Sequence, residues 1–155
     1  MINVFELKKL YNKKDKMHDW SHILRIKNRV KLLRKGCDNI DEGLLQFLVY
    51  YHGLKEFVLD NKKEFDRRYV TSLMRHNKKP KLIEEKIVFD ANLLDNLGKP
   101  GIRKALYVGK MLNRDVSKTK EFVSRGLKGV CFYTRIGKKI GKFEFETIKR
   151  WSETE

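Results

Sequence analysis

Apolar residues recur at intervals of three and four along most of the chain, and strict two-residue alternation is almost absent. Ile23, Ile26, Val30 and Leu33 follow this spacing, which places them on one face of an α-helix. A chain of 155 residues is long enough to bury a substantial core. We therefore predict an all-α protein, a compact helical bundle in which residues 1–155 form a single domain.

The same periodicity, together with stop and start signals, predicts where the helices lie. Asp41 is a plausible N-cap, and Gly36 and Gly53 are natural helix ends. The predicted helices cover about 4–11, 19–35, 42–52, 65–75, 82–95, 102–112, 117–123 and 139–151. We expect a connector at 54–61 and a break around Gly98 and Pro100.

The charge balance narrows the classes of partner. The chain has 36 Lys and Arg against 20 Asp and Glu, a net charge of +16. Such a protein attracts polyanions, including nucleotides and nucleic acid, although scattered lysines more often only solvate helix faces. The two cysteines, Cys37 and Cys131, are too few and too far apart for a zinc finger. No signal peptide and no run of about 18 apolar residues is present, so we predict a cytoplasmic protein with no membrane contact.

Titratable residues fall on faces that should be buried. Asp90 lies three residues after Ile87 and seven after Ile83, on the apolar stripe of its helix. A buried carboxylate without a partner costs several kcal/mol, so such groups are paired, hydrogen-bonded or bound to a metal. The inward residues are His22, His52, His76, Asp90 and Asp95. If they meet, imidazoles and carboxylates from separate helices make a divalent-metal site.

Each of these residues also has a simpler interpretation. A lone histidine on an apolar face is more often a hydrogen-bonded core residue than a ligand. A lone inward aspartate is more often a helix cap or an ion-pair partner. The metal hypothesis gains weight because all four histidines fall near predicted inner faces or helix ends.

Three segments carry a resemblance to a known family. They are 18–26 (HDWSHILRI), 48–53 (LVYYHG) and 86–103, which begins KIVFDANLLDNLG. In this order and spacing they resemble the motifs of the HD-domain metal-dependent phosphohydrolases, in particular a small bacterial type that acts on nucleotides. The resemblance covers roughly the first two-thirds of the chain and implies a compact helical fold with a buried metal.

The resemblance also implies roles for individual residues. One divalent metal ion (Mn, Fe, Co, Ni, Mg or Zn) would be held by His22, His52 and Asp90. The catalytic groups would be His76, Arg25 and Asp95, of which the first two stabilise charge on the phosphate and the third orients a histidine. The substrate-binding groups would be His18 and Asp19 at the mouth, with Lys78 and Lys79 on a nearby basic turn.

Two positions depart from the family pattern. Gly53 stands where the family's defining His-Asp pair has its aspartate, which normally ligates the metal, and Asn92 replaces an aspartate in the third segment. Three remaining ligands plus water can still form a catalytic site. We therefore predict a metal-dependent phosphohydrolase whose substrate is a nucleotide or a related anionic phosphorylated small molecule. The alternative is a catalytically inactive module of the same fold that binds a phosphorylated ligand, nucleic acid or a protein partner.

Overall fold

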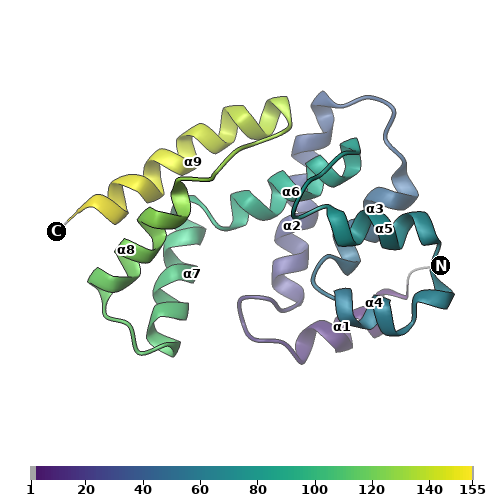
Figure 1. The fold of residues 1–155 in the computed structure, drawn as a ribbon, viewed down its shortest axis with the longest axis horizontal. Helices are drawn as coiled ribbons and strands as arrows, with labels where there is room; N and C mark the ends of the chain where they lie inside the picture. The colour runs from purple at the N-terminus through teal and green to yellow at the C-terminus, as the bar shows by residue number, and fades with distance from the viewer. Residues whose placement is uncertain (1–2, 155) are drawn as a thin grey trace. The chain divides into compact units, whose positions relative to one another are not determined.

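The computed structural model describes residues 3–154, and every regular element in that range is helical (Figure 1). The α-helices are α1 (Val4–Asn12), α2 (Trp20–Leu33), α3 (Glu42–Tyr51), α4 (Lys55–Asp60), α5 (Arg67–Arg75), α6 (Ile83–Asp95), α7 (Gly98–Met111), α8 (Val116–Leu127) and α9 (Arg135–Glu153). Two 3-10 turns, Arg34–Gly36 and Lys62–Glu64, follow α2 and α4. The predicted all-α class is confirmed.

The chain packs as two compact units, Met1–Ala91 and Asn92–Glu155, and the division falls within α6. The expectation of one domain over residues 1–155 stays a prediction. None of the helices in the described range is long and apolar enough to cross a membrane.

Three helices of the first unit begin at an aspartate N-cap. Asp19 accepts hydrogen bonds from backbone N–H groups at the start of α2, Asp41 does the same for α3, and Asp66 for α5. Each cap satisfies donors that the first helical turn would otherwise leave unpaired. The caps fix where α2, α3 and α5 start, and His22, His52 and His76 lie in or at the end of these helices.

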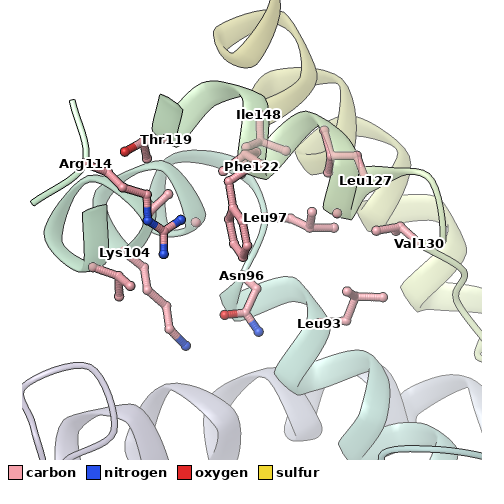
Figure 2. Close-up of a pocket in the computed structure, with 15 residues that line it drawn as sticks. Leu93, Asn96, Leu97, Lys104, Arg114, Thr119, Phe122, Leu127, Val130 and Ile148 are labelled. Atoms are coloured by element: carbon pink, nitrogen blue, oxygen red, sulfur yellow. The ribbon is translucent and has the colours of Figure 1, made fainter. Parts of the chain in front are cut away.

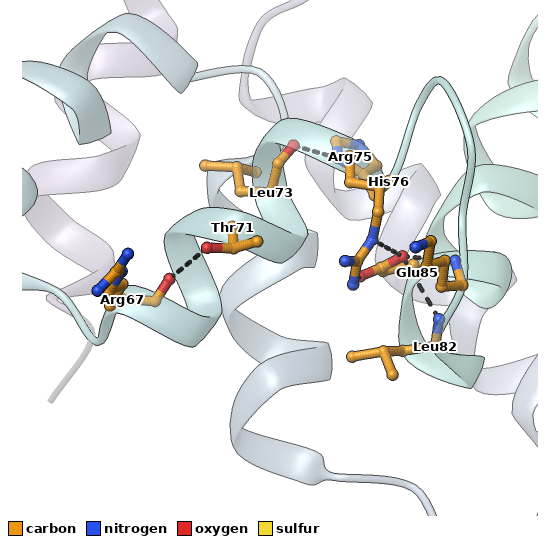
Figure 3. A network of polar contacts seen from close by, with 8 residues as sticks. Arg67, Thr71, Leu73, Arg75, His76, Leu82 and Glu85 are labelled. Atoms are coloured by element: carbon orange, nitrogen blue, oxygen red, sulfur yellow. Dashed lines mark hydrogen bonds and ion pairs between the residues drawn. The ribbon is translucent and has the colours of Figure 1, made fainter.

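A buried ion pair joins the end of α5 to the start of α6 (Figure 3). Glu85 is fully buried, and its carboxylate accepts hydrogen bonds from Nε of Arg75 at 3.0 Å, from a second guanidinium nitrogen, and from the backbone N–H of Lys81 at 2.7 Å. The backbone N–H of Leu82 also donates to it, at 3.4 Å, as a third-position glutamate does in a capping box. The pair therefore stabilises the turn between His76 and the start of α6.

Close backbone approach shapes the second unit. An ideal Cβ on Gly109, in α7, would lie 2.3 Å from Oγ1 of the buried Thr119, in α8. An ideal Cβ on Gly141, in α9, would lie 2.1 Å from the ring of Phe132. Only glycine allows so close an approach, of α8 to α7 at Gly109 and of the Phe132 ring to α9 at Gly141.

The helix predictions missed one helix and placed three helix ends four residues short, namely the starts of α7 and α9 and the end of α8. Residues 55–60, expected as a connector, form α4, because one short turn of helix buries Val58. The break expected at Gly98 and Pro100 is narrower than predicted, since α7 begins at Gly98 and places Pro100 in its first turn. Proline is tolerated there because the first-turn N–H groups have no partner within the helix.

We predict that Glu85→Gln lowers the free energy of unfolding by about 1–3 kcal/mol at neutral pH, because it leaves buried donors poorly paired. The hydrogen bonds of Arg75 help to hold the pKa of Glu85 below its usual value against the effect of burial. The stabilisation is therefore present above the carboxyl's usual pKa and is lost as pH falls through the lowered one. Denaturant unfolding from pH 7 to pH 3 tests this, with the exposed Glu56→Gln as control. An equal decrease in the free energy of unfolding for the two variants would contradict this prediction.

We also predict opposite effects for two glycines of the second unit. Gly109→Ala should destabilise the protein by about 1–3 kcal/mol, since the methyl group collides with Thr119. Gly126→Ala, in α8 with nothing within 4 Å of its Cβ position, should stabilise it by about 0.5–1 kcal/mol. Thermal unfolding of both variants is the measurement, and a neutral Gly109→Ala would refute the close approach.

Candidate functional site

Two histidines of the first unit end helices in the same way. His52 is the C-cap of α3 and His76 is the C-cap of α5. The Nδ1–H of His52 donates to the carbonyl oxygen of Val49 at 2.9 Å, and that of His76 donates to Leu73 at 2.7 Å (Figure 3). A carbonyl can only accept, so Nδ1 carries the proton. In each neutral ring Nε2 therefore keeps its lone pair.

A third histidine faces the first of these rings. His22 lies in the first turn of α2 and is buried. Its Nε2 is 3.1 Å from Nε2 of His52, and the two ring centroids are 5.2 Å apart. The rings of His52 and His76 are 6.4 Å apart, so histidines from three helices form one row. The structure thus brings together three of the five residues that were predicted to point inward.

The surroundings keep two members of the row uncharged. Burial, followed by the charge of His22, lowers the pKa of His52 to about 3. Burial, with a smaller contribution from Lys55, lowers the pKa of His76 to about 4. Neutral imidazole is the form that binds a metal, so both rings have the correct protonation state at neutral pH.

The distance between the His22 and His52 nitrogens tests whether they suit a shared ion. Two nitrogens bound at about 2.0–2.1 Å to one tetrahedral or octahedral cation lie about 2.8–3.4 Å apart, and 3.1 Å falls within that range. The same distance suits a hydrogen bond between the rings. Among the described residues, no group of three or more His, Cys, Asp or Glu side chains has metal-binding geometry. The spacing of the imidazole pair therefore fits a metal ion.

The two aspartates predicted to point inward are both buried. Asp90 is fully enclosed in the first unit, and Asp95 is 2% exposed and ends α6 in the second unit. Burial confirms the helical projection. The ligand role of Asp90 and the orienting role of Asp95 stay predictions.

The predicted residues at the mouth have local partners. His18 is exposed and its Nδ1 lies 2.8 Å from the Asp15 carboxylate. Asp19 uses one carboxylate oxygen to cap α2, and Arg25 donates to Oγ of Ser21 at 3.1 Å. Asp19 thus has a structural task besides any contact with substrate.

A cation beside the histidine row was missed in the sequence. Lys55, in α4, donates to the side-chain oxygen of Asn77 at 2.7 Å, and burial and the charge of Lys78 lower its pKa. The charge of Lys55 also contributes to lowering the pKa of His76. Lys78 and Lys79 are exposed on the turn that follows this histidine. The sequence did not indicate a role for Lys55, because residues 55–60 were expected to form a connector and not a helix.

Gly53 does not leave an empty space. Its ideal Cβ would lie 3.1 Å from both Cε1 and the hydroxyl oxygen of Tyr11, a fully buried residue of α1. The Tyr11 hydroxyl donates to the carbonyl of Tyr50 at 2.8 Å and accepts from the N–H of Gly53 at 3.3 Å. A tyrosine side chain therefore occupies the space next to Gly53. This is the position at which the family that the sequence resembles has an aspartate.

Comparison with known proteins identifies the fold. No family model and no curated protein matches the sequence. Among solved structures, the Lin1889 protein from Listeria innocua is 21% identical with a TM-score of 0.66, covering 98% of this chain and 94% of its own. Bacillus subtilis YpgQ, solved in complex with ADP, is 16% identical with a TM-score of 0.70, covering 95% and 87%. A Lactobacillus plantarum protein is 16% identical with a TM-score of 0.69, covering 97% and 95%. The chain shares the fold of these proteins.

Proposed function

We propose that the protein is a metal-dependent phosphohydrolase that acts on a nucleotide or a related phosphorylated small molecule. The observation that carries the proposal is the His22–His52 pair, whose Nε2 atoms face each other at 3.1 Å. The helix C-cap of α3 turns His52 so that its lone pair points at His22. The resemblance of the three sequence segments and the similar fold of a protein solved with ADP support the substrate class.

In this proposal some residues bind the metal and others bind the phosphate. His22 and His52 would hold the cation, with Asp90 as the predicted third ligand. When bound, the metal would lower the pKa of a coordinated water and polarise a phosphoryl oxygen. His76 would accept through the lone pair of its Nε2 a hydrogen bond from a water molecule or from a protonated phosphate oxygen, and Lys55 would attract the anion to the same side.

A second candidate is a module that binds a phosphorylated ligand without turning it over. The specific observation in its favour is Gly53, which supplies no carboxylate, together with Tyr11, which fills the adjoining space. Loss of one anionic ligand reduces metal affinity. The histidine row and nearby lysines would then serve as a polar anion site.

We predict that the purified protein binds Mn²⁺ or Zn²⁺ and that His52→Ala lowers metal affinity at least about tenfold, because one of two facing nitrogens is lost. Equilibrium dialysis measures the metal, and phosphate release from a nucleotide panel measures turnover. His18→Ala is the matched control for metal affinity alone, since this histidine is exposed, pairs with Asp15 and is not a proposed metal ligand.

The outcomes separate the two candidates. Metal binding with turnover that falls in His52→Ala supports the hydrolase. Ligand-dependent thermal stabilisation without turnover, in the presence of metal, supports the binding module. An affinity for nucleic acid that falls steeply with salt would instead indicate binding through the basic surface.

We predict that Gly53→Asp alone lowers the melting temperature and does not raise metal affinity, because the new side chain must displace the buried Tyr11 ring. The double variant Tyr11→Ala/Gly53→Asp should bind metal more tightly than Tyr11→Ala, which is the matched background. A single Gly53→Asp variant that is stable and binds metal more tightly would contradict the steric account.

A further inference from the structure

The second unit contains an apolar pocket that the proposed function does not use (Figure 2). Its volume is about 310 Å³, at the lower end of the range of ligand pockets. Leu97 from the α6–α7 junction, Val108 from α7, Phe122 from α8 and Ile148 from α9 contribute to its wall. Protein interiors are normally close-packed, so a hollow of this size among apolar side chains favours an apolar occupant.

The two cationic side chains of the pocket lie on one side of it. Figure 2 shows Lys104 and Arg114 on one side of the pocket and Leu93, Leu127 and Val130 on the other, with Phe122 between them. The occupant that matches this arrangement has an apolar part and an anionic end.

The Arg114 guanidinium is already oriented for such an end. Its Cζ lies 4.5 Å from the centroid of the Phe122 ring, a cation–π contact that limits its freedom. Phe122 is 55% exposed, so this contact lies towards the opening of the pocket. A guanidinium held in place binds a carboxylate or phosphate through two parallel hydrogen bonds.

We propose that this pocket binds a single-chain anionic amphiphile, with the acyl chain against Leu97, Val108 and Ile148 and the head group at Lys104 and Arg114. The chain class follows from the apolar wall, and the charge of the head follows from the two cations. This site is independent of the histidine row, which lies in the first unit.

Titration of the full-length protein with octanoate, decanoate and dodecanoate, below the concentrations at which they form micelles, tests the proposal. Calorimetry should show one saturable site whose affinity rises with chain length, and thermal unfolding should show a matching stabilisation. Decanol, which lacks the charge, should bind about tenfold more weakly than decanoate. Decyl phosphate binding as tightly as decanoate would show that the head site accepts either anion, as proposed.

Variants separate the head site from the chain site. Lys104→Gln/Arg114→Gln should weaken decanoate about tenfold and leave decanol unchanged, whereas Lys110→Gln, an exposed lysine of the same helix, should change neither. Val108→Phe should fill the pocket and abolish binding of both. Since Val108→Phe can also disturb folding, the charge variant tests the head site separately.

Three results would overturn the proposal. They are no saturable binding of any carboxylate, equal affinity for decanoate and decanol, and a concentration-dependent dimer in sedimentation that Phe122→Ser dissociates. The last result would show that a second copy of the chain covers the apolar wall.

Discussion

The hydrogen bond from a histidine Nδ1–H to a backbone carbonyl at a helix end is the interaction on which the candidate site depends. It occurs at the C-caps of both α3 and α5, where His52 and His76 donate to Val49 and Leu73. It satisfies a carbonyl that the helix end leaves unpaired, and it also fixes the ring and its tautomer. One local hydrogen bond thus caps the end of a helix and leaves the lone pair of Nε2 available.

The surrounding contacts hold these histidine rings in position. The Arg75–Glu85 pair holds the turn after His76, and the Asp19 N-cap places His22 in the first turn of α2, so that its Nε2 faces that of His52. Tyr11 closes the space beside Gly53 with hydrogen bonds to the backbone on either side of His52. The Tyr11 ring therefore fills the space beside Gly53, and a carboxylate side chain placed at this position would have to displace that ring.

Helical periodicity predicted the all-α class and the burial of His22, Asp90 and Asp95, because these depend on spacing within one helix. The meeting of His22 and His52 was also predictable, since buried polar groups need partners. Two features were not. Helix α4 is too short for its periodicity to show, which hid Lys55, and the contact of Tyr11 with Gly53 joins residues 42 positions apart. Such contacts arise from tertiary packing and leave no mark in local sequence.

The proposed function requires that His22 and His52 share a divalent cation. The most direct measurement is a crystal structure of the protein soaked in Mn²⁺, with anomalous scattering recorded for the metal. A shared cation should give an anomalous peak within about 2.2 Å of Nε2 of both residues. Absence of a peak there at saturating Mn²⁺, with the two rings still hydrogen-bonded to each other, would contradict it.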